Sequence, residues 1–225
     1  MTADRTSLTA ALIDDARVVG VALAPGAVDK ILDYVALLAR WNPKVRLVGP
    51  DDPMTILREQ VVDALGMVPA IAEAGCEVWL DVGAGGGLPG LVAAALLPDR
   101  HLILVEPIAK KTAFLMQVAI ALDLRNITIH TGRAEPSGVA PALPARAPRP
   151  TGALSRATLA PPAWVALASA LLGPGGTILI AAADTRDVPA PIMHDPATRR
   201  RDYTIPATGA PRLVLTHVVP ALTEK

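Results

Sequence analysis

The sequence predicts an α/β protein with a Rossmann-like fold, in which an N-terminal helical cap precedes a mostly parallel seven-stranded sheet. Two observations carry this prediction. From residue 77 onward, short apolar runs alternate with helical patterns, which is typical of right-handed βαβ units. One of these runs ends on Asp81 and enters a loop, 83–90, that has five glycines in eight residues.

Residues 1–75 are predicted to be the helical cap and residues 76–225 the Rossmann-like core, together one compact unit. Apolar residues recur at intervals of three and four, which indicates one buried helical face; they are Val28, Ile31, Leu32, Val35, Leu38 and Ala39. We expect Asn42-Pro43 to end that helix, because proline disfavours helical continuation. A second helix is expected over 53–74.

The core pattern predicts strands and helices in alternation. Between them, residues 135–150 are rich in proline, alanine and arginine and are expected to form a surface loop. The expected strands are 78–82, 102–106, 127–130, 153–156, 177–182, 203–206 and 213–219, and the expected core helices are 91–97, 110–124 and 162–172.

The net charge limits how the protein could bind RNA. The formal net charge of the 225 residues is zero, so any contact with RNA must come from a local patch and not from a general basic field.

Cys76 is the single cysteine, which excludes an internal disulfide and fits a reducing cytoplasm. The four histidines lack metal-ligand spacing. We expect a cytoplasmic protein with no metal, no export signal and no membrane segment.

The glycine loop is the expected ligand site. Glycine lets a ligand approach the backbone, and a following helix offers N–H groups at its start. Two motifs overlap here: Gly85-x-Gly87-x-x-Gly90 fits a dinucleotide fingerprint, and Asp81-x-Gly83-x-Gly85 fits an S-adenosylmethionine loop. Asp81, the acid before Gly83, favours the S-adenosylmethionine loop. A tight turn without any ligand is the plainer alternative. Glu106 ends the next strand, where it is expected to grip ribose hydroxyls.

These residues resemble the ribosomal RNA small subunit methyltransferase G family, also called the glucose-inhibited division protein B family. Its loop has the form D-x-G-[ST]-G-x-G-x-P-G, which residues 81–90 follow except at Ala84. Further matches cover most of the chain from about Val35 to Ala183; they are Trp41-Asn42, Asp63, Lys110-Lys111, Phe114-Leu115, Gly132-Arg133-Ala134-Glu135 and Ser155-Arg156-Ala157.

The resemblance implies a class I S-adenosylmethionine-dependent methyltransferase. The implied reaction transfers a methyl group to N7 of a guanosine in 16S ribosomal RNA, with that RNA or the small ribosomal subunit as partner. The N7 lone pair is free, so no catalytic residue is expected, only close in-line approach with water excluded. Together with the loop chemistry, the expected cofactor-binding residues are Asp81, Gly83, Gly85, Leu88, Glu106, Ala134, Glu135 and Arg156.

The chain departs from the family on the substrate side, which marks it as a divergent member. The family's Arg-His-x-x-Asp-Ser is Glu59-Gln60-Val61-Val62-Asp63-Ala64 here, and its Lys-Gly after the fifth strand is Ala182-Ala183. These changes leave a degenerate fold kept for binding as one alternative. An NAD(P)-dependent oxidoreductase using Gly85, Gly87 and Gly90 is another.

Several cationic and aromatic residues allow two interpretations. Arg156 is expected to hold the methionine carboxylate or an RNA phosphate, or else to pair with a surface carboxylate. Lys110-Lys111, Arg133 and the run 199–201 are either solvated or in contact with RNA phosphates. Trp41 either stacks a base or fills the core between cap and sheet.

Overall fold

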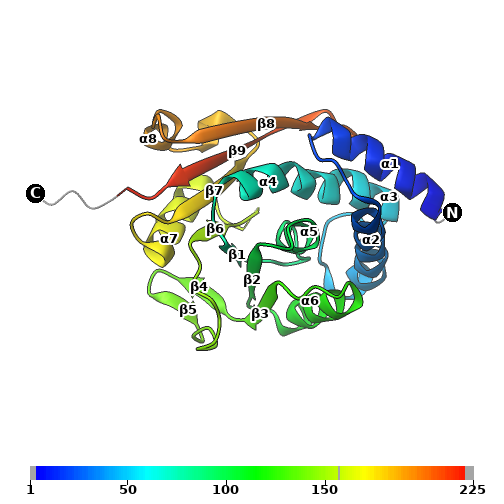
Figure 1. Ribbon diagram of the computed structural model, residues 1–225, viewed down its shortest axis with the longest axis horizontal. Coiled ribbons are helices and arrows are strands. Elements are labelled where there is room, and N and C mark those ends of the chain that lie inside the picture. Colours follow the sequence, from blue (N-terminus) through cyan, green and yellow to red (C-terminus); the bar gives the residue numbers. More distant parts are fainter. Residues whose placement is uncertain (1–3, 157, 221–225) are drawn as a thin grey trace, which may run out of the picture.

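A seven-stranded sheet forms the centre of the computed structural model, which describes residues 4–156 and 158–220 (Figure 1). Its strand order is β3-β2-β1-β6-β7-β9-β8. This order confirms the predicted α/β class, with β1 inside the sheet between β2 and β6. The strands are β1 (Val78–Val82), β2 (His101–Glu106), β3 (Ile127–Thr131), β6 (Gly152–Leu154), β7 (Thr177–Ala182), β8 (Arg199–Ile205) and β9 (Ala210–Val218).

The sheet is mostly parallel, as predicted. The pairs β1–β2, β2–β3, β1–β6 and β6–β7 are parallel, whereas β9 is antiparallel to both β7 and β8. Because β9 runs in the opposite sense, its first residues lie at the carboxyl edge of β7, where Leu213 is opposite Ala182. The last two strands therefore contribute side chains to the edge at which parallel sheets bind ligands.

Both faces of the sheet are buried, which explains the continuous apolar runs in its strands. Successive residues of a strand point to opposite faces. In β2, Leu102 and Leu104 belong to a large apolar cluster shared with the helical cap. Ile103 and Val105 belong to a second cluster that includes Trp164 of the helix after β6.

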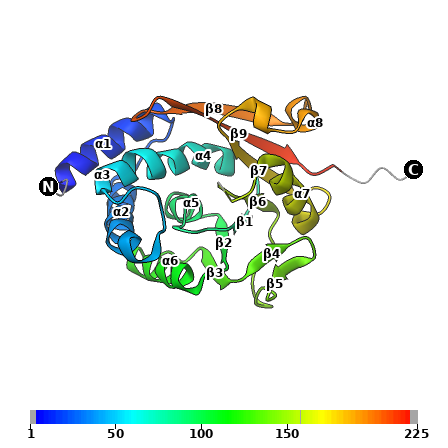
Figure 2. The same cartoon turned by 180° about the vertical axis from the view of Figure 1, so that it is seen from behind.

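The helices are divided unequally between the two faces, and α7 lies on the opposite side of the sheet from α2, α5 and α6 (Figures 1 and 2). A helix of unusual length precedes β1: α3, a π-helical turn and α4 follow one another without a break from Pro53 to Glu73. The described helices contain none that is long and apolar enough to cross a bilayer. The helical segments are α1 (Arg5–Val18), α2 (Pro25–Val45), α3 (Pro53–Thr55), the π turn (Ile56–Val61), α4 (Val62–Glu73), α5 (Gly90–Leu96), α6 (Ala109–Ala121), α7 (Pro161–Leu172) and α8 (Ala190–Met193), with a 3-10 turn at Thr185–Asp187.

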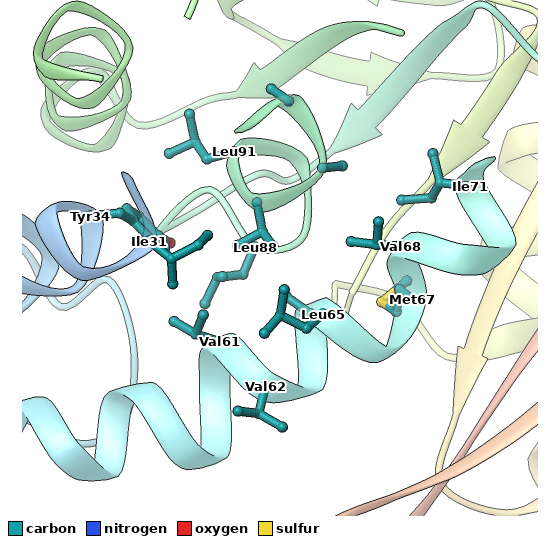
Figure 3. Close-up of a cluster of buried hydrophobic side chains, with 14 of the residues drawn as sticks. Ile31, Tyr34, Val61, Val62, Leu65, Met67, Val68, Ile71, Leu88 and Leu91 are labelled. Atoms are coloured by element: carbon teal, nitrogen blue, oxygen red, sulfur yellow. The ribbon is translucent and has the colours of Figure 1, made fainter. Parts of the chain in front are cut away.

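The cap packs directly on the glycine loop. Figure 3 shows Val61, Leu65 and Val68 of the long helix pointing toward Leu88 of the loop, with Tyr34 of α2 nearby. All five belong to the same apolar cluster, and each side chain is at most 5% exposed. The apolar periodicity of the N-terminal segment therefore serves to hold the loop against the sheet.

Two local expectations were wrong. Pro43 does not end α2, which continues to Val45, with Arg46 in the left-handed conformation as its cap. A proline this close to the end of a helix removes only one backbone hydrogen bond, so the helix tolerates it. The segment 135–150 is not all loop, because Arg133–Glu135 (β4) and Gly138–Ala140 (β5) pair as an antiparallel hairpin.

The contact between β1 and β6 gives a test of the packing. Gly152 lies opposite Trp79, and an added Cβ would come within 2.5 Å of Cε3 of this fully buried indole. We expect Gly152→Ala to lower the free energy of unfolding by about 1–3 kcal/mol through overpacking, measured by urea denaturation. The control is Gly26→Ala in α2, where an added Cβ meets nothing within 4 Å. Equal stability of the two variants would contradict this account.

Candidate functional site

A cavity of about 770 Å³ opens at the carboxyl ends of the parallel strands. Its volume suits a nucleotide-sized ligand. Its walls come from the glycine loop, the ends of β2 and β7, the segment after β6, the long cap helix and the last two strands. The residues that carry the argument below are Gln60, Asp63, Gly83, Gly85, Leu88, Glu106, Lys111, Arg156, Tyr203 and Arg212.

The glycine loop leaves β1 in a conformation that requires glycine. Gly83 has φ +72° and Gly87 has φ +89°, both in the left-handed region. A Cβ on Gly83 would also lie 2.6 Å from Oγ1 of Thr158. The loop therefore presents bare backbone to the cavity, as a site for a flat nucleoside requires.

Glu106 is at the tip of β2 and faces this backbone. Its Oε2 accepts a hydrogen bond from the amide of Gly85 at 2.9 Å, and its Oε1 accepts one from the amide of Ile108 at 3.0 Å. The side chain is buried, yet it lines the cavity. Each carboxylate oxygen keeps a second lone pair, so the group can also accept hydrogen bonds from ligand hydroxyls.

Asp81 lies beneath the loop and is not among the wall residues, in contrast to the sequence expectation. Its Oδ2 accepts a hydrogen bond from the amide of Gly90 at 2.9 Å, so this acid caps the start of α5. The amide of Gly90 is therefore bonded within the protein and is not one of the free N–H groups expected at the start of this helix. Oδ1 is buried without a hydrogen-bond partner among the described residues. Burial raises the pKa of Asp81 to about 7.

Tyr34 connects the cap to the same loop. Its hydroxyl donates a hydrogen bond to the carbonyl oxygen of Gly86 at 2.6 Å, and the side chain is 1% exposed. Burial raises the pKa of this phenol, which keeps it protonated and able to donate. Together, Asp81, Glu106 and Tyr34 hold the loop at three points.

Arg156 lines the cavity and is paired with the cap. Its Nη1 lies 3.0 Å from Oδ2 of Asp63 and donates to the carbonyl oxygen of Gln60, also at 3.0 Å. The expected alternative of a salt bridge is thus present, although in a half-buried position. The same Asp63 carboxylate accepts a hydrogen bond from the hydroxyl of Tyr203 and lies 3.3 Å from Nε of Arg212.

The structure does not bring every expected residue to the cavity. Ala134 and Glu135 lie in β4 and are not among the wall residues, and Arg133 beside them is exposed. Ala157, the last residue of the Ser155-Arg156-Ala157 match, lies outside the described residues. The expected roles of Ala134 and Glu135 depend on the resemblance alone.

The remaining candidates are assigned by their contacts. Lys111 lines the cavity, whereas Lys110 is exposed. Trp41 packs against Phe114 with ring centroids 5.7 Å apart, which favours its role in the core. The run 199–201 begins β8, where Arg199 and Arg201 donate hydrogen bonds to carbonyl oxygens of the cap, those of Glu73 and Val19.

Sequence reasoning missed three wall or support residues: Tyr34, Tyr203 and Arg212. Tyr34 lies on the helical face that the periodicity identified, but nothing in the pattern predicts where its hydroxyl points. Tyr203 and Arg212 are opposite one another in β8 and β9 and meet the cavity only because β9 inserts between β7 and β8.

Comparison with known proteins identifies the family. Residues 27–187 match the family model of the rRNA small subunit methyltransferase G. The chain is similar to two proteins named ribosomal RNA small subunit methyltransferase G. The one from Herminiimonas arsenicoxydans is 41% identical over 59% of this chain and 62% of its own length. The one from Burkholderia pseudomallei is 39% identical over 78% of this chain and 75% of its own length. The chain therefore spans less than two thirds of the first of these relatives and three quarters of the second.

Solved structures share the fold at low identity. A putative O-methyltransferase from Klebsiella pneumoniae superposes with a TM-score of 0.59 at 16% identity, covering 94% of this chain and 96% of that one. The O-methyltransferase TomG from Streptomyces achromogenes, in complex with SAM, gives a TM-score of 0.55 at 15% identity, covering 96% of this chain and 99% of that one. The fold is that of the class I S-adenosylmethionine-dependent methyltransferases.

The raised pKa of Asp81 predicts a pH dependence of stability. In the unfolded chain this carboxyl titrates near 3.8, and in the folded protein near 7. Between these values the folded state binds the extra proton, so stability falls as pH rises, by up to about 1.4 kcal/mol per pH unit. The free energy of unfolding of Asp81→Asn, measured in urea, should lack the part of this pH dependence that comes from Asp81.

The comparison is made at pH 5 and pH 7.5. We expect Asp81→Asn to gain roughly 2–3 kcal/mol relative to the wild type between the two values. Asp99→Asn, at an exposed position before β2, serves as the matched control and should follow the wild type. Parallel pH profiles for wild type and Asp81→Asn would contradict the assignment.

Proposed function

The chain belongs to the rRNA small subunit methyltransferase G family, and we propose that it transfers a methyl group from S-adenosylmethionine to N7 of a guanosine in 16S ribosomal RNA. The single observation that carries this proposal is the pairing of Glu106 with the amide of Gly85 at one end of the cavity. It brings an acid and a bare glycine backbone together, as a nucleoside site requires.

The residues present suit the cofactor. Glu106 is the acceptor for the ribose hydroxyls, and the backbone of Gly83, Gly85 and Leu88 forms the cradle beside them. Arg156, at the other side of β1, is the cation for the methionine carboxylate. From the family pattern, Ala134 and Glu135 flank the adenine. They lie in β4, which contacts β2, the strand that carries Glu106. Asp81 acts indirectly, by fixing the loop through Gly90.

Methyl transfer to guanine N7 requires no general acid or base from the protein. Bound S-adenosylmethionine supplies a sulfonium whose methyl group is already activated. The guanine N7 carries a free lone pair, so no base has to remove a proton first. The chain's own contribution is to orient both partners and to keep water out, for which Leu47, Val48 and Met67 provide apolar wall.

A ribosomal methylation assay tests the proposed activity. We expect the purified protein to transfer labelled methyl groups to small ribosomal subunits from cells that lack this methylation, with naked 16S RNA tested in parallel. Mapping the labelled base then identifies the guanosine. Cofactor binding without any label in the RNA would reject the activity and favour the alternative of a fold kept for binding.

Replacement of Glu106 tests the cofactor site. We expect Glu106→Gln to weaken binding of S-adenosylhomocysteine by about ten-fold or more, because a hydrogen bond to a charged acceptor contributes about 1.5–3 kcal/mol. Calorimetry measures the change. Glu77→Gln, an exposed position just before β1, should bind as the wild type does. Tight NAD binding without S-adenosylhomocysteine binding would instead support the oxidoreductase alternative.

A further inference from the structure

The cavity extends beyond the part that the cofactor is proposed to occupy. Glu106 is the last residue of β2 and Arg156 comes just after β6; the two strands are two positions apart in the sheet, or roughly 10 Å. Arg212 is in β9, four strand positions from β2, or roughly 19 Å along the sheet. The backbone of Arg212 therefore lies farther along the sheet than a ligand held between Glu106 and Arg156, although the side chains of Arg212 and Arg156 meet at Asp63.

Arg212 is held at this end by a carboxylate that it shares with Arg156. Nε of Arg212 lies 3.3 Å from Oδ1 of Asp63, and Nη1 of Arg156 lies 3.0 Å from Oδ2. Tyr203, opposite Arg212 in the sheet, donates its hydroxyl to Oδ1 and to the backbone oxygen of Asp63, both at 2.9 Å. The carboxylate of Asp63 is only 12% exposed, so its position is fixed by the surrounding packing.

The charges of this cluster do not balance. Two guanidinium groups share one carboxylate, which leaves a net charge of about +1 in a partly buried site where an unpaired charge is costly. Arg212 is 31% exposed, and its Nη2 has no acceptor among the described residues, whereas Nη1 donates to the carbonyl of Pro211. Arg156 is the cation assigned to the methionine carboxylate, so Arg212 is the one of the two arginines whose partly exposed guanidinium is left to meet another anion.

We propose that Arg212, positioned by Asp63 and Tyr203, binds a phosphate of the acceptor RNA strand in the β7–β9 part of the cavity. This inference rests on the proposed function. Arginine suits a phosphodiester because its planar fork donates two parallel hydrogen bonds. Glu59 and Asp187 also line the cavity, so the walls are not generally basic, and the contact is directed by this one arginine. Tyr203 and Arg212 lie outside the family match, which ends at residue 187.

Binding of small ribosomal subunits at a series of KCl concentrations tests the contact, with S-adenosylhomocysteine present. We expect Arg212→Gln to raise the Kd for subunits about ten-fold. The slope of log Kd against log salt should fall by about 0.7, the value for one phosphate contact in a single strand. Arg212→Lys keeps the charge and should retain the slope. A purely structural role would change the slope in neither variant.

Two controls separate the possible failures. Arg125→Gln, an 85% exposed arginine just before β3 at the opposite edge of the sheet, should leave both Kd and slope unchanged. S-adenosylhomocysteine affinity of Arg212→Gln is measured in parallel, because Arg212 and Arg156 share Asp63 and can influence one another. A loss of cofactor affinity as large as the loss of subunit affinity would show that Arg212 acts through Arg156, and would overturn the phosphate contact.

The outcomes are distinguishable from those of the proposed function. Wild-type protein that binds subunits without methylating them would reject the activity, while the salt slopes would still decide on the phosphate contact. Wild-type slope and Kd in Arg212→Gln would overturn the contact even where methylation is intact. Wild-type protein with no affinity for subunits would overturn both.

Discussion

The conformation of one loop depends on carboxylates at the tips of two neighbouring strands. Asp81 accepts a hydrogen bond from Gly90, and Glu106 accepts one from Gly85, so the loop is held at both ends. Tyr34 binds the carbonyl between them, at Gly86. A glycine-rich segment has more conformational entropy to lose than any other, and these three contacts offset that cost. Without them, the cavity would have no defined wall on the side of β1 and β2.

The helical cap supplies the outer wall of the cavity, which the sheet alone cannot form. A parallel sheet presents only the ends of its strands at the binding edge, so the outer wall of a cavity must come from another element. Here the long helix Pro53–Glu73 provides that wall, and its π-helical turn ends at Val61, two residues before Asp63. Such wide turns are frequent at functional sites. Asp63 then connects the cap to the segment after β6 through Arg156 and to β9 through Arg212.

The main features of the fold were predictable because they depend on local chemistry. Continuous apolar runs identified the strands, and the glycines after Asp81 identified the loop, since glycine adopts the φ of +72° and +89° found at Gly83 and Gly87 without steric cost. The roles of individual side chains were less predictable. Asp81 and Glu106 look equivalent in the sequence, each ending an apolar run, but one caps a helix from below and the other faces the cavity. Both side chains point to the same face of the sheet, because Asp81 is paired with Leu104, two residues before Glu106. What distinguishes them is how far along the sheet each acid lies, and this depends on a register that the sequence does not determine.

The substrate side of the cavity shows why departures from a family motif do not by themselves mean loss of function. Gln60 stands where the family has histidine, yet its backbone oxygen and side chain both contact Arg156, at 3.0 and 3.4 Å. A backbone carbonyl is available whatever the side chain, so the position of Arg156 depends less on residue 60 than on Asp63, which the chain retains. Breaking a half-buried pair such as Asp63 with its two arginines leaves an uncompensated charge, at a cost of about 3–5 kcal/mol for a fully buried one. That penalty applies to Asp63, whose side chain makes the ion pairs, and not to residue 60, whose 3.0 Å contact with Arg156 is made by its backbone.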